Sequence, residues 1–154
     1  RGVPESLGGL GFTCFAVAMT IFRLTGDRLI ARTGALRAVV GGAIVAAVGF
    51  ALVTFVPQWQ LSLVGYVLVG AGCANIVPVM FSAVGRQTRM PQAVAVPAIT
   101  TMGYLGVLAG PAIIGYMAHA TSLTQAFMVI MLLMLVVAML SVTVTANQPA
   151  RSEG

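Results

Sequence analysis

Charged residues are scarce in this sequence. They make up 7% of the 154 residues, whereas hydrophobic residues make up 59%, and the mean hydropathy is +1.03. A soluble domain usually carries about 25% charged residues, because its surface must be hydrated. No Asp, Glu, Lys or Arg occurs from 38 to 85 or from 90 to 150. This scarcity argues against a soluble domain, and the length of the uncharged runs predicts an all-α membrane protein.

Sequence motifs that carry chemistry are also lacking. Cys14 and Cys73 have no CxxC spacing and no clustered His or acidic partners, so neither a metal site nor a disulfide is predicted. There is no HExxH, no GxSxG and no Walker-type loop. The arginines behind the net charge of +5 sit at the ends of apolar runs rather than on a basic face with aromatics. We therefore expect no enzyme, no cofactor and no nucleic-acid partner; the lipid bilayer is the expected partner.

Five membrane-spanning helices are predicted within one membrane domain, residues 1–154. Their approximate ranges are 7–24, 38–56, 61–85, 93–118 and 126–145. The second and fifth spans are almost pure hydrocarbon, whereas the others hold most of the Gly, Pro, Thr, Tyr and Asn. Because close helix packing needs small residues and buried polar groups need partners, we expect the first, third and fourth spans to be central. The second and fifth should face lipid.

Residues 23–37, the charged segment, hold Asp27 and four of the eight arginines, and they are predicted to form a loop after the first span. With five spans, this segment shares one side of the membrane with the turn at residues 86–92 and with the C-terminal tail. That side holds seven arginines and the other holds only Arg1. The positive-inside rule therefore places the C-terminus in the cytoplasm and the N-terminus outside.

Two polar residues inside spans are candidates for a substrate path. Asn75 needs hydrogen-bond partners at membrane depth, and it serves either an interhelical hydrogen bond or a solute. Tyr104 lies near the centre of a span and is the better cavity candidate among the tyrosines. Pro78 and Pro97 are expected to bend or open their spans. The residues predicted to serve helix packing or a hinge are Pro78, Gly103, Gly106, Gly110 and Pro111.

The charged segment resembles the signature loop between the second and third helices of each half of a major facilitator superfamily transporter. The matching residues are Gly26, Asp27, Arg28, Arg32, Gly34 and Arg37. Their spacing departs from the family pattern, with Gly26 directly before Asp27 and three residues between Arg28 and Arg32, and it is closer to the looser loop of the second half than to the strict loop of the first. The pattern of glycines and Pro111 in the fourth span also resembles the family, as does the third span with Gly70, Gly72, Asn75 and Pro78. The resemblance covers nearly the whole chain, as helices eight to twelve of twelve.

This resemblance implies an incomplete six-helix half-bundle from a longer protein of the bacterial inner membrane, an interpretation that fits a chain opening on Arg1. It implies secondary active or facilitative transport of a small solute by alternating access, with an N-terminal half as the missing partner. The charged segment would act as a conformational latch, holding one arrangement of the two halves through charge-assisted bonds to helix ends. The alternative is a non-transporting membrane module that serves only as an assembly partner or scaffold.

Overall fold

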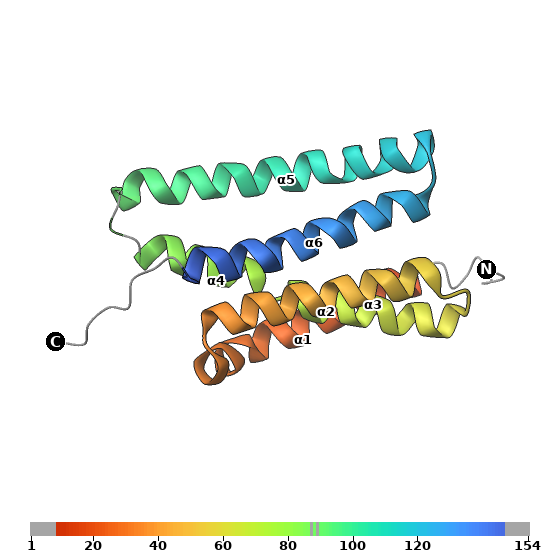
Figure 1. Cartoon of the computed structure of the whole chain (residues 1–154), viewed down its shortest axis with the longest axis horizontal. Coiled ribbons are helices and arrows are strands. Elements are labelled where there is room, and N and C mark those ends of the chain that lie inside the picture. Colours follow the sequence, from red (N-terminus) through yellow and green to blue (C-terminus); the bar gives the residue numbers. More distant parts are fainter. Residues whose placement is uncertain (1–8, 87, 89, 147–154) are drawn as a thin grey trace.

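The computed structural model describes residues 9–86, 88 and 90–146, and every regular element in this part of the chain is an α-helix. The helices in chain order are α1 (Leu10–Thr33), α2 (Ala35–Phe55), α3 (Trp59–Cys73), α4 (Ile76–Arg86), α5 (Gln92–Ala120) and α6 (Leu123–Ala146). Short connections join them into a bundle (Figure 1). The all-α fold predicted from the sequence is therefore confirmed.

Four stretches of the described chain are long and apolar enough to cross a membrane. They are α2, the α3–α4 stretch (Trp59–Arg86), α5, and Leu123–Thr143 of α6. They correspond to the second to fifth predicted spans, with ends that differ by a few residues. Helix α1 has 24 residues and is not among these four stretches. Its second half carries Arg23, Asp27, Arg28 and Arg32.

The sequence predicted a loop at the charged segment, and this prediction is wrong: all of the segment except Gly34 is helical. Helix α1 continues to Thr33, nine residues beyond the predicted end of the first span, and α2 begins at Ala35. Arg, Leu and Ala are good helix formers whatever their polarity, so charge alone does not end the helix. Gly34 ends it, with φ +85° and an N–H donated to the carbonyl oxygen of Ile30 at 2.8 Å. The chain therefore reverses at a single glycine, in a conformation that L side chains rarely adopt.

The third span is broken between α3 and α4, at residues 74–75. Pro78 has no backbone N–H, so it cannot donate to the carbonyl oxygen of Ala74 as an uninterrupted helix would require. The next bond, from the N–H of Val79 to the carbonyl oxygen of Asn75, is present at 3.2 Å. The break is where Pro78 was expected to open the span. In contrast, α5 stays helical through both Pro97 and Pro111.

The core of the bundle lies between α1, α2 and α3, where glycines let the backbones approach closely. A Cβ on Gly49 of α2 would lie 2.7 Å from the carbonyl oxygen of Gly65 of α3. Closer to the other end of the same pair, a Cβ on Gly72 would lie 2.6 Å from the backbone nitrogen of Ala46. Close backbone approach of this kind is the usual role of small residues between membrane helices.

The expectation that the second span faces lipid is wrong. Helix α2 packs against both α3 and α6, and it has more buried residues than any other described helix. Its buried side chains are small and β-branched, so an apolar composition concealed a tightly packed face. The buried residues of α2 are Val39, Ala43, Ala46, Ala47, Gly49, Val53 and Thr54.

Helix α5 differs from α2 in almost every respect of packing. It packs against α4 and α6, and Ala95 is its one buried residue. Figure 1 shows α5 running along the outside of the bundle, separated from α1, α2 and α3. The fourth span was expected to be central. It is instead the most exposed of the four described stretches that could span a membrane: only 6% of the residues in its most apolar 18-residue stretch are buried.

Candidate functional site

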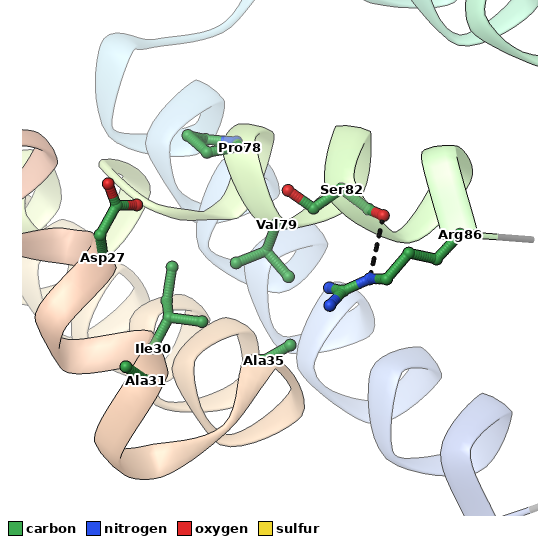
Figure 2. Close-up of a pocket in the computed structure, with 8 residues that line it drawn as sticks. All are labelled: Asp27, Ile30, Ala31, Ala35, Pro78, Val79, Ser82 and Arg86. Atoms are coloured by element: carbon green, nitrogen blue, oxygen red, sulfur yellow. Dashed lines mark hydrogen bonds between the residues drawn. The ribbon is translucent and has the colours of Figure 1, made fainter.

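A cleft of about 270 Å³ lies between the end of α1 and α4. Figure 2 shows Asp27 and Arg86 on opposite sides of it, with the apolar side chains of Ile30 and Val79 between them. The Nε of Arg86 donates a hydrogen bond to the backbone oxygen of Ser82 at 3.2 Å, so the arginine is held along α4. The full lining is Asp27, Ile30, Ala31, Ala35, Pro78, Val79, Ser82 and Arg86. A negative and a positive side chain thus face the same partly apolar space.

The predicted latch residues lie together at this end of the bundle, on α1, Gly34 and the first turn of α2. Asp27, Arg28 and Arg32 are exposed on α1, and Arg37 is exposed on α2. Arg32 occupies the last turn of α1, where a positive side chain interacts favourably with the helix dipole. Because these four charged side chains are exposed, they are available for ionic contacts with neighbouring groups at this end of the bundle.

Asn75 is buried at the break between α3 and α4, with 7% of its surface exposed. Its Nδ2 donates a hydrogen bond to the carbonyl oxygen of Phe22 in α1 at 3.2 Å. The amide lies against Gly26, where a Cβ would overlap the Oδ1 of Asn75. Of the two roles left open for Asn75, the interhelical hydrogen bond is therefore present. The contact also explains why Gly26 is buried beside exposed charged residues.

Tyr104, the other predicted substrate-path residue, is 67% exposed on α5 and lines neither of the two clefts described here. Tyr66 is half-buried and does line a cleft, one of about 290 Å³ between α2, α3 and the start of α6. The other lining residues of this cleft are Val53, Thr54, Leu123, Thr124 and Phe127. Sequence reasoning ranked Tyr104 above Tyr66 by depth in the span.

The glycines predicted for packing in the fourth span contact no other helix in the described structure. A Cβ on Gly103, Gly106 or Gly110 would meet nothing within 4 Å. Pro111, next to Gly110, is exposed. This GxxxG face is therefore open along the outer helix. The role of these glycines in packing stays a prediction.

Within the described residues, no group of three or more His, Cys, Asp and Glu side chains is placed to hold a metal ion. Cys14 and Cys73 are both free thiols of intermediate exposure. The chemistry available at the α1–α4 cleft is consequently that of one carboxylate (Asp27), one arginine (Arg86), a serine hydroxyl (Ser82) and backbone groups. Such groups bind and release partners through charge-assisted hydrogen bonds.

The chain is similar to known proteins of one family. The family model described as Major Facilitator Superfamily matches residues 1–154. An uncharacterized MFS-type transporter of Yersinia pestis is 44% identical over 138 residues, which are 90% of this chain and 36% of that protein. Membrane protein MosC of Rhizobium meliloti is 30% identical over 151 residues, 98% of this chain and 37% of that protein.

A third relative, an uncharacterized transporter of Sinorhizobium fredii, is 29% identical over 140 residues, or 91% of this chain and 37% of its own length. The chain thus spans little more than a third of the length of the curated relatives it matches. No solved structure matches it.

Proposed function

Because the chain belongs to the major facilitator superfamily, we propose that it forms part of the C-terminal half of a transporter that moves a small solute by alternating access. In such proteins two six-helix halves rock about a site near the bilayer midplane, with either facilitated or ion-coupled movement of the solute. The match to transporters along nearly the whole chain supports this assignment. Family membership also favours a transporter over an enzyme.

The observation that carries the proposal is the open face of α5. This helix has 29 residues, is apolar enough to span a membrane, and buries Ala95 alone. Gly103, Gly106 and Gly110 leave room for another helix to approach its backbone, which is what small residues in membrane helices commonly provide. We assign this face to helices of the N-terminal half of the same protein, so that α5 lines the boundary along which the halves move.

The charged segment serves as the conformational latch in this proposal. Asp27 faces the α1–α4 cleft, while Arg28, Arg32 and Arg37 are exposed around it. In one arrangement of the halves these side chains bond to helix ends of the other half, and in the other arrangement they are released. Gly26 and Gly34 complete the latch by shaping the backbone, one at a close contact and the other at the turn.

The substrate path is proposed to run along α5 rather than through the interior of α1, α2 and α3. Tyr104 has an exposed side chain on α5 and is our candidate for contact with the solute. Asn75 is buried and held to α1 by its amide, so in this proposal it supports the helices and does not contact the solute. A cysteine at position 104 should be protected from a water-soluble reagent when solute is bound.

The proposed orientation places the charged segment in the cytoplasm of a bacterium, in its inner membrane. Figure 1 supports it: the α1–α2 turn, the end of α4 and the end of α6 lie at one end of the bundle. Four arginines of the described chain lie at or near that end, namely Arg28, Arg32, Arg37 and Arg86, and Arg23 lies near the middle of α1. Arg1, Arg89 and Arg151, which also enter the count, lie outside the described residues. Positive charge favours the cytoplasmic side.

The proposal is tested by uptake. The full-length transporter is reconstituted in liposomes, and solutes are first chosen by their ability to raise its melting temperature. We expect saturable uptake of at least one such solute by the full-length protein. Liposomes holding only this chain should show none, because the chain lacks the half against which α5 moves. Measurable uptake by the chain alone would contradict the proposal, and stable full-length protein without uptake of any stabilising solute would favour the scaffold alternative.

A further inference from the structure

Helix α4, which follows the break in the third span, is held at both of its ends. Helix α3 ends at Cys73 and α4 begins at Ile76, so α4 is a separate rod of 11 residues. At the start of this rod the amide of Asn75 is bonded to α1. At its end, the Nε2 of Gln92 donates a hydrogen bond to the carbonyl oxygen of Gly85 at 2.7 Å, which ties α4 to the start of α5. Helix α4 also packs against α2 and α5, and these two hydrogen bonds are the side-chain ties that hold its two ends to α1 and α5.

The contact with α1 is a close fit between two residues. The Nδ2 of Asn75 lies 3.2 Å from the carbonyl oxygen of Phe22, an oxygen already placed to accept the N–H of Gly26 in the helix. Gly26 lies one turn further on, and a Cβ there would overlap Oδ1 of Asn75 and lie 2.9 Å from its Nδ2. Only a glycine at 26 leaves room for the amide in this position. The buried amide therefore has a defined hydrogen-bond partner, Phe22, and a fixed position against Gly26.

This contact between Asn75 and α1 adjoins the α1–α4 cleft. Asp27, which follows Gly26 directly, lines the cleft from α1, and Pro78 and Val79 line it from the first turn of α4. Val79 is buried, with 6% of its surface exposed. A shift of Asn75 away from α1 would move Pro78 and Val79 away from Asp27, because only two residues separate Asn75 from Pro78. The separation of the two walls is thereby set at the break.

We propose that Asn75 is a positioning residue that fixes α4 against the end of α1 and so sets the width of the α1–α4 cleft. Release of its amide from Phe22 and Gly26 lets α4 move together with α5, to which Gln92 holds it. The link between this movement and transport rests on the proposed function, whereas the tie itself does not. The charged segment on α1 and the break in the third span would then move together, because Asn75 connects them.

The test uses the full-length transporter with Cys14 and Cys73 replaced by alanine and with Val79→Cys as a probe. Val79 is buried in the cleft wall, so a water-soluble maleimide should reach position 79 faster when α4 moves away from α1. Asn75→Ala should raise the labelling rate about threefold, the factor that corresponds to one average interhelical hydrogen bond in a membrane. The matched control is Thr20→Val, which removes a hydroxyl bonded within α1 to the carbonyl oxygen of Ala16. It should leave the rate unchanged.

A second variant keeps the test informative if Asn75→Ala folds poorly. Gly26→Ala should raise labelling of position 79 because its methyl group displaces the amide, and Gly41→Ala, where a Cβ meets nothing within 4 Å, should not. In the double variant Gly26→Ala with Asn75→Ala, the clash is gone, so its rate should equal that of Asn75→Ala alone. Fully additive effects would show that the two residues act independently and would overturn the proposal.

Labelling needs no solute, and this separates the two proposals. An unchanged labelling rate in folded Asn75→Ala protein, judged by its melting temperature, overturns the positioning role whatever the uptake shows. A full-length protein without uptake overturns the proposed function while the labelling result still decides the role of Asn75.

Discussion

At the scale of the single residue, Gly34 decides where α1 stops. Its φ of +85° and ψ of 154° lie where residues other than glycine are strained. Gly34→Ala should therefore lower the free energy of unfolding of the full-length protein by about 1–3 kcal/mol. The space around Gly34 is open, so a clash does not contribute.

The control for that substitution is Gly41→Ala, the same chemical change inside α2, at a helical position with equally open space. It should be neutral or slightly stabilising, because alanine is the better helix former. The comparison is made by thermal unfolding in detergent. Equal melting temperatures for the two variants would show that the turn at Gly34 relaxes at no cost.

Asn75 and Gly26 show which features of single residues could be predicted from the sequence and which could not. The sequence showed that Asn75 is polar at membrane depth and needs a partner, and the hydrogen bond to Phe22 is one. It did not show that the partner lies 53 residues away in α1, because a backbone carbonyl leaves no trace in the side-chain pattern. The burial of Gly26 among charged residues had no sequence signal for the same reason.

At the scale of the helix, α5 is the long apolar helix with the least packing among the described residues. Its glycines leave an open face that we assign to the N-terminal half, so a large side chain there should obstruct the approach of that half. In the full-length protein Gly106→Leu should reduce uptake by about fivefold or more, since overpacking a close contact costs about 1–3 kcal/mol. Uptake in proteoliposomes at equal protein content gives the measurement.

Gly41→Leu is the matched control for this change, because Gly41 is exposed on α2 and a Cβ there meets nothing within 4 Å. Uptake should stay near that of the unchanged protein. If Gly106→Leu and Gly41→Leu behave alike, α5 does not face the other half, and the open glycines of Gly103, Gly106 and Gly110 serve no close contact.

The helices themselves were predictable, whereas their ends and their neighbours were only partly so. Uncharged runs fixed the second to fifth spans within a few residues, because a chain in lipid must satisfy its backbone in helices. The first span was ended too early, since its charges at Arg23 and Asp27 suggested a loop although the residues favour a helix. The central place of α2 was missed because glycine and alanine pack closely without any polar signal.

At the scale of the whole molecule, the chain forms a bundle with a packed side and an open side. Helices α1, α2 and α3 pack through glycines, while α5 stands outside with α6 and α4 as its neighbours. The curated relatives are nearly three times as long as the matched region. Both facts fit a bundle that is completed by further helices of the same protein, and the open side is where we expect them.

The central claim is that the complete protein alternates between two arrangements and that the charged segment controls their balance. The most direct measurement is the labelling of a cysteine at position 104, in place of Tyr104, from each face of sealed vesicles. For the full-length protein we predict that a stabilising solute protects position 104 and lowers its labelling rate from both faces. Asp27→Asn, which removes the charge and keeps the shape, should shift the ratio of the rates without solute. Rates that are insensitive to both the solute and Asp27→Asn would contradict the account.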